Sequence, residues 1–141
     1  MKSETVNRKV LIVDDDPEMR IFLSTVLATG GFIPIVAENG REAVNKALVE
    51  SPILIILDIM MCSKENLYIN IRQDKRFQDI PVIMLSALSR NTVFHFQKYQ
   101  SSIFGYRVPE PEAYIEKPPE AEDLLNIVNK LISHLVNPSK S

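Results

Sequence analysis

The chain has 141 residues, of which 45% are hydrophobic and 24% charged, and this size and composition are those of one ordinary globular domain. Sixteen basic and eighteen acidic side chains give a formal net charge of −2, and their scattered distribution argues against direct nucleic-acid binding. Cys62 is the single cysteine, which excludes an intramolecular disulfide and favours a reducing, cytoplasmic location. Neither an apolar export signal nor a run long enough to span a membrane is present in the sequence.

Short apolar runs alternate with segments of helical period along the chain. Apolar runs bounded by polar, Pro or Gly residues predict strands buried on both faces, and these runs are 10–13, 32–37, 53–57 and 82–85. Apolar side chains spaced three or four residues apart predict amphipathic helices, at 19–27, 43–48, 67–77, 92–99 and 124–132. With a short run at 113–115, the predicted order is five strands alternating with five helices.

This alternation of strands and helices predicts an α/β fold, in which a parallel sheet lies between two layers of helices. All strands of such a sheet end at the same edge, and ligands bind at that edge where the strand order reverses. We therefore expect the residues that directly follow the predicted strands to be neighbours. The polar residues in these positions are Asp14, Asp15 and Asp16, then Asp58, Ser86 and Lys117.

Taken one at a time, these side chains have ordinary structural explanations. Asp16 precedes Pro17 and is predicted to cap the helix that begins there. Asp14 and Asp15 form a carboxylate pair whose repulsion a bound cation would relieve, and a solvated acidic turn is the alternative. The polar residues after the later strands could each belong to a loop, a cap or a turn. Their predicted convergence at one edge of the sheet favours a functional site.

Four motifs at these strand ends resemble the CheY-like receiver domain of bacterial two-component response regulators. They are Val10-Leu-Ile-Val-Asp-Asp-Asp-Pro17, Leu57-Asp-Ile-Met-Met61, Pro81-Val-Ile-Met-Leu-Ser-Ala87 and Tyr114-Ile-Glu-Lys-Pro118. The resemblance implies a flavodoxin-like, doubly wound sheet of five parallel strands in the order 2-1-3-4-5, with five helices in three α/β/α layers. It also implies one receiver domain over residues 9–136, between flexible tails at 1–8 and 137–141.

The resemblance assigns phosphoryl-transfer chemistry to the side chains at the strand ends. It implies that Asp58 accepts a phosphoryl group from a sensor histidine kinase or a phosphotransfer protein, and that Lys117 contacts a phosphoryl oxygen. The peptide bond between this lysine and the proline after it is implied to be cis. The implied cofactor is Mg²⁺, bound directly by Asp15, Asp58 and the main-chain carbonyl of Met60, and by Asp14 through a water. Such a protein is not an enzyme toward other substrates, because it catalyses only its own phosphorylation and dephosphorylation.

The resemblance further implies that phosphorylation acts as a switch. The new phosphoryl oxygens would recruit Ser86, and the ring of Tyr114 would turn inward and change the face formed by the fourth helix, the last strand and the last helix. That face is the expected surface for a downstream protein or for a homodimer, with output passing through protein contacts or a further domain. Met60 and Leu88 offer no hydrogen bond to an attacking water, so we expect slow self-dephosphorylation.

The chain departs from the family pattern at two places, and two alternatives stay open. Cys62 stands where the family usually has Pro, and the 31 positions from Ser86 to Lys117 exceed the usual interval. The longer interval gives some weight to a pseudo-receiver that binds a partner without being phosphorylated, and the intact set of Asp14, Asp15, Asp58, Ser86 and Lys117 argues against it. The other alternative is a haloacid-dehalogenase-like phosphatase with Asp14 as its nucleophile, although the hydroxyl residue expected after the Asp14-x-Asp16 motif is missing.

Overall fold

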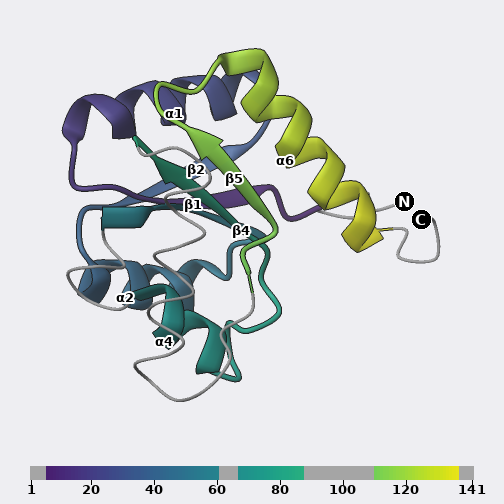
Figure 1. The fold of residues 1–141 in the computed structure, drawn as a ribbon. Helices are drawn as coiled ribbons and strands as arrows, with labels where there is room; N and C mark the ends of the chain where they lie inside the picture. The colour runs from purple at the N-terminus through teal and green to yellow at the C-terminus, as the bar shows by residue number, and fades with distance from the viewer. Residues whose placement is uncertain (1–5, 61–66, 88–109, 137–141) are drawn as a thin grey trace.

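The computed structural model describes residues 6–60, 67–87 and 110–136, and its centre is one parallel sheet (Figure 1). Five strands lie in the order β2-β1-β3-β4-β5. Their bounds are Lys9–Val13 for β1, Ile33–Ala37 for β2, Leu54–Asp58 for β3, Val82–Ser86 for β4 and Ala113–Glu116 for β5. The first and last residues of each predicted strand lie within one residue of the observed bounds, and the strand order 2-1-3-4-5 is confirmed.

Helices cover both faces of the sheet, which confirms the three-layer α/β/α architecture. They are α1 (Pro17–Thr29), α2 (Gly40–Glu50), α4 (Leu67–Gln73) and α6 (Ala121–Val136). In Figure 1, α1 and α6 lie on one face of the sheet, and α2 and α4 lie on the other. The helix predicted at 92–99 lies outside the described residues.

Two apolar cores lie on the two faces of the sheet. Because successive side chains of a strand point to opposite faces, Val10 and Ile12 of β1 pack with residues of α1 and α6. Leu11 and Val13 of the same strand pack with residues of α2 and α4. Strands β3 and β4 are buried along their whole length. The continuous apolar runs of the central strands therefore follow from burial on both faces.

Strand β2 is less buried than predicted. Its apolar run predicts a strand buried on both faces, but Ile33 is 51% exposed and only Ala37 of this strand is buried. The physical reason is its place at the edge of the sheet, where one side has no neighbouring strand. An apolar run alone does not distinguish a central strand from an edge strand.

The outer side of β2 presents few main-chain groups. The Ile33 N–H donates to the Arg8 carbonyl at 2.8 Å, so the odd-numbered residues of β2 point their main-chain groups toward β1. The even-numbered residues, Pro34 and Val36, point theirs outward. Pro34 has no N–H, and the Val36 carbonyl accepts a hydrogen bond from Lys46 Nζ at 2.6 Å. Lys46 of α2 therefore covers part of this edge.

The residues before β1 contact the folded domain. Asn7 Nδ2 donates to the Ser51 carbonyl at 2.8 Å, and Arg8 Nε donates to the Gly31 carbonyl at 2.6 Å. Residues 1–5 and 137–141 lie outside the described residues, so the flexible tails stay a prediction. Among the helices that the structure describes, none has the length and the apolar composition needed to cross a membrane.

Candidate functional site

The turn between β1 and α1 holds a buried carboxylate beside an exposed one. Asp14 is 1% exposed, and its N–H donates to the Ala37 carbonyl at 3.1 Å. Asp14 Oδ1 accepts the Asp16 N–H at 2.9 Å. Asp16 in turn caps α1 by accepting the Glu18 N–H at 3.0 Å, as the sequence predicts. The turn thus directs the Asp14 carboxylate inward, while Asp15 stays exposed.

Asp58 is the last residue of β3 and is 4% exposed. Its Oδ1 accepts the Met60 N–H at 3.2 Å. Burial raises the pKa of Asp58 and the neighbouring Asp14 carboxylate raises it further, and these effects outweigh the lowering by the Lys117 ammonium and the Met60 N–H. Ionised Asp58 is therefore less stable here than a carboxylate in water.

Lys117 lies directly after β5 and reaches both buried carboxylates. Its Nζ is 2.9 Å from Asp14 Oδ2 and 3.5 Å from Asp58 Oδ2. The bond between Lys117 and Pro118 is cis, as the resemblance implies. Burial lowers the pKa of Lys117, but the hydrogen bond and charge of Asp14, together with the charge of Asp58, raise it overall. Lys117 is thus a fixed positive charge at the edge of the sheet.

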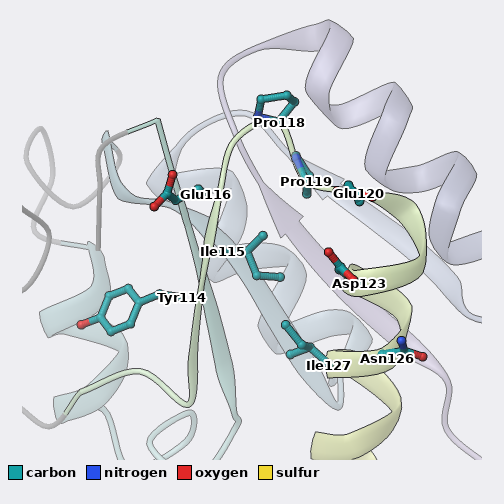
Figure 2. Close-up of a pocket in the computed structure, with 9 residues that line it drawn as sticks. All are labelled: Tyr114, Ile115, Glu116, Pro118, Pro119, Glu120, Asp123, Asn126 and Ile127. Atoms are coloured by element: carbon teal, nitrogen blue, oxygen red, sulfur yellow. The ribbon is translucent and has the colours of Figure 1, made fainter. Parts of the chain in front are cut away.

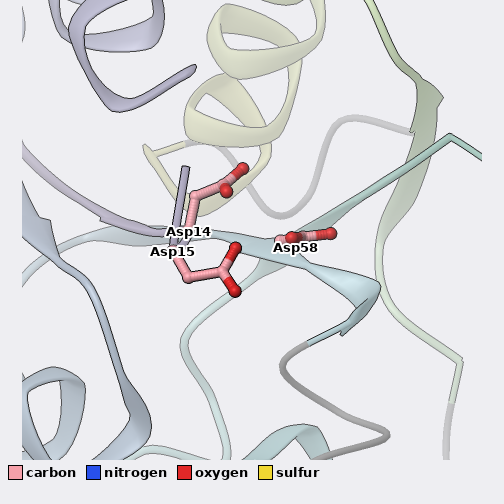
Figure 3. A group of neighbouring side chains, drawn as sticks. All are labelled: Asp14, Asp15 and Asp58. Atoms are coloured by element: carbon pink, nitrogen blue, oxygen red, sulfur yellow. The ribbon is translucent and has the colours of Figure 1, made fainter. Parts of the chain in front are cut away.

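Three carboxylates lie together at this edge of the sheet (Figure 3), and Lys117 Nζ lies beside two of them. One carboxylate oxygen from each of Asp14, Asp15 and Asp58 lies within 4.8 Å of the others. Oxygen donors of this kind suit Mg²⁺, a hard cation that keeps several waters. Because three carboxylates lie together here and the Lys117 ammonium contacts two of them, a divalent cation would also relieve their repulsion. The donor set therefore fits Mg²⁺, while a role for the Met60 carbonyl stays a prediction.

The two residues predicted to act as a switch lie on neighbouring strands. Ser86 ends β4, is 3% exposed, and its carbonyl accepts the Lys117 N–H at 2.8 Å. Tyr114 pairs in register with Met84, two residues before Ser86, and packs against the apolar core on the α2 and α4 side. Ser86 therefore adjoins the carboxylate site, and Tyr114 lies further along β5.

Arg20 adjoins the site and was missed by the sequence analysis. Its Nη1 donates to the main-chain carbonyl of Asp14 at 2.8 Å, and its Nη2 is 3.7 Å from Glu38 Oε2. The only sequence signal is a basic residue in the early part of the helix that Asp16 caps. This position is also common for solvated side chains, so the sequence alone does not single it out.

Comparison with known proteins settles the family. The sequence matches the family described as response regulator receiver domain over residues 10–129. The chain belongs to this family. The probable transcriptional regulator ycf27 of Cyanophora paradoxa is 30% identical over 138 residues, which are 98% of this chain and 54% of that relative. A relative of the same name from Guillardia theta is 42% identical over 80 residues, which are 57% of this chain and 31% of the length of that relative.

Solved structures of receiver proteins share the fold. Chemotaxis response regulator CheY4 of Vibrio cholerae has a TM-score of 0.70 and 25% identity, and the match covers 89% of this chain and 98% of that one. The receiver domain of a signal transduction histidine kinase from Syntrophus aciditrophicus has a TM-score of 0.73 and 28% identity, with 92% of each chain covered. This receiver domain is therefore a two-component signalling domain of CheY-like fold, and the phosphatase alternative loses its support.

Proposed function

We propose that this receiver domain accepts a phosphoryl group onto Asp58 from a sensor histidine kinase or a phosphotransfer protein, with Mg²⁺ as cofactor. The observation that carries the proposal is the buried Asp58 carboxylate, which lies 3.5 Å from Lys117 Nζ and beside the carboxylates of Asp14 and Asp15. We place this exchange in the cytoplasm, in keeping with the single cysteine of the chain.

The chain's own residues suit a phosphoryl transfer to a carboxylate. One Asp58 oxygen forms a bond to phosphorus while the bond from phosphorus to the donor's imidazole nitrogen breaks, and that nitrogen keeps the electron pair. Lys117 supplies positive charge for a phosphoryl oxygen, because its ammonium already lies beside Asp58. Asp14, Asp15 and Asp58 would hold Mg²⁺, and bound Mg²⁺ supplies further positive charge for the phosphoryl oxygens.

The proposal is tested by incubating the full chain with Mg²⁺ and acetyl phosphate, followed by intact mass measurement and peptide mapping. We expect one added phosphoryl group at Asp58 that disappears when Mg²⁺ is chelated. Asp58→Asn should abolish the label, while the exposed Asp79→Asn control should keep it. A label that survives Asp58→Asn and is lost in Asp14→Asn would restore the phosphatase alternative. No label under any condition would favour the pseudo-receiver.

The face that phosphorylation would switch is partly described by the structure. In Figure 2 the Tyr114 ring lies on the side of β5 away from α6, and Ile115 points toward α6. A cavity of about 460 Å³ lies between β5 and α6, lined by residues 114–116, 118–120, 123, 126 and 127. We infer that recruitment of Ser86 by the phosphoryl group moves Tyr114 and changes this face for a downstream protein or a second copy.

The switch is tested by NMR with a stable acyl-phosphate mimic and Mg²⁺. Resonances of β5 and the start of α6 should shift in the wild type and stay in place in Asp58→Asn, which cannot form the mimic. Unchanged resonances of β5 and α6 in the wild type, despite bound mimic, would rule out the switch.

The lifetime of the acyl phosphate depends on groups that orient an attacking water. Met60, two residues after Asp58, is 49% exposed, and its side chain has no strong hydrogen-bonding group. Leu88 lies outside the described residues. We expect slow loss of the label from the isolated protein and faster loss from Met60→Asn. Rapid loss from the wild type would contradict this part of the proposal.

A further inference from the structure

The guanidinium of Arg20 binds the main chain at the start of the carboxylate site. Arg20 lies on α1, and its side chain is 18% exposed. Nη1 donates to the Asp14 carbonyl at 2.8 Å, and Nη2 is 3.7 Å from Glu38 Oε2 in the turn after β2. The Glu38 N–H is itself held by Glu42 Oε1 at 3.0 Å, at the start of α2. One side chain therefore connects α1, the carboxylate turn and the turn before α2.

The hydrogen bond from Arg20 fixes a peptide plane that matters for cation binding. The Asp14 carbonyl belongs to the peptide bond that leads into Asp15, so its direction sets where the Asp15 side chain begins. The other side of Asp14 is held by its N–H, which donates to the Ala37 carbonyl at 3.1 Å. Of the contacts described around this peptide, the bond from Arg20 is the one that orients the carbonyl.

We propose that Arg20 is a positioning residue for the divalent cation. It holds the Asp14–Asp15 peptide so that both carboxylates face one ion together with Asp58. This inference rests on the Mg²⁺ site of the proposed function. It gives Arg20 a role through the main chain, distinct from the charge that Lys117 places beside Asp58.

Arg20 could act as a positive charge or as a positioning group, and these two roles predict opposite effects of its removal on Mg²⁺ affinity. If Arg20 acts only as a positive charge, its loss reduces repulsion toward a divalent cation, and Mg²⁺ binds more tightly. If Arg20 positions the peptide, its loss leaves the Asp14 carbonyl without this donor and loosens the peptide that leads into Asp15, and Mg²⁺ binds more weakly. Groups that orient metal ligands typically contribute about 10- to 100-fold in metal affinity. The sign of the change therefore separates the two accounts.

The experiment is calorimetric titration of the full chain with Mg²⁺, repeated with Mn²⁺ and read by electron paramagnetic resonance. We expect Arg20→Met to weaken binding of both ions about tenfold. Arg20→Lys should recover part of this loss, because an ammonium can still donate to the Asp14 carbonyl. Arg41→Met removes a charge from an exposed position at the start of α2 and should leave binding unchanged or slightly tighter.

The outcomes separate the two proposals. A wild-type chain that binds neither ion overturns the metal site, and the role of Arg20 with it. A wild-type chain that binds Mg²⁺, with Arg20→Met binding equally or more tightly, overturns the role of Arg20 alone. Thermal melting with a chelator shows whether Arg20→Met folds. If it does not, the shorter Arg20→Gln replaces it, and wild-type Mg²⁺ affinity in that variant would overturn the inference.

Discussion

The two ends of the sheet both bury charged side chains, but they do so in different ways. At the carboxyl edge, the buried carboxylates of Asp14 and Asp58 share the single ammonium of Lys117. At the opposite end, where the strands begin, Arg72 of α4 forms an ion pair with Glu112, which directly precedes β5. At the end where the strands finish, the buried carboxylates outnumber the ammonium group. At the end where they begin, one guanidinium pairs with one carboxylate.

The Arg72 cluster satisfies its polar groups internally. The guanidinium, on a side chain 5% exposed, donates to Glu112, and to Tyr68 Oη at 3.0 Å. It also donates to the carbonyls of Gln78 at 3.1 Å and Ile80 at 3.0 Å. Burial lowers the pKa of Arg72, but its contacts with Tyr68 and Glu112 raise it overall. A balanced cluster of this kind stabilises the fold, and an unbalanced one provides a place for a cation.

The largest expected effect comes from breaking the balanced cluster. Arg72→Met leaves the carbonyls of Gln78 and Ile80 without their donor, and we expect it to lower the free energy of unfolding by about 3 kcal/mol. Denaturant unfolding with a chelator measures this change. Arg76→Met, which breaks an exposed pair, is the control. A loss in Arg72→Met no larger than in Arg76→Met would remove the distinction between the two ends of the sheet.

The second-largest expected effect is the stabilisation of the folded protein by Mg²⁺. Mg²⁺ at one hundred times its dissociation constant should raise the free energy of unfolding of the wild type by about 2.7 kcal/mol, because only the folded state holds the site. Asp58→Asn should lose most of this gain, and Arg72→Met should keep it. Denaturant curves with and without Mg²⁺ give the result. An equal gain in Asp58→Asn would place the bound ion elsewhere.

A smaller effect of opposite sign is expected from Asp58→Asn without metal. Because folding raises the pKa of Asp58, the folded state binds more protons than the unfolded state between pH 3.8 and that raised value. The contribution of this group to stability is therefore present below pH 3.8 and is lost as the pH rises through the raised pKa. At neutral pH, Asp58→Asn should therefore stabilise the metal-free protein. Destabilisation at pH 7 would contradict this account.

The smallest effect is expected at an exposed ion pair. Arg76 lowers the pKa of Asp74 to about 2 through hydrogen bonds from its guanidinium and its N–H. Solvent and salt screen such a pair, and Asp74→Asn keeps an oxygen that can accept the Arg76 N–H at 2.9 Å. We therefore expect no measurable change in the unfolding midpoint. A loss comparable to that of Arg72→Met would mean that burial is not what separates these clusters.

The alternation of strands and helices and the main site residues could be predicted because their signals are local, whereas the strand order was predicted from the resemblance to a known family. Apolar runs mark the strands, and Asp58 and Lys117 directly follow strands whose ends the parallel topology brings together. The partial exposure of β2 could not be predicted, since nothing in an apolar run indicates an edge. The roles of Arg20 and Arg72 could not be predicted either, because their ion-pair partners, Glu38 and Glu112, lie outside their own helices. Glu112 follows Arg72 by 40 residues and shares no periodic pattern with it.

The partly covered outer side of β2 has a consequence for crowded solutions. The unpaired main-chain groups of an edge strand can form hydrogen bonds with a strand of another chain, and this is a common route to aggregation and fibrils. Here Pro34 has no N–H to donate, and the Val36 carbonyl already accepts a hydrogen bond from the Lys46 ammonium. A strand of another chain could therefore not form a continuous row of hydrogen bonds along β2. The outer side of β2 is therefore a poor template for a continuous intermolecular sheet between copies of this protein.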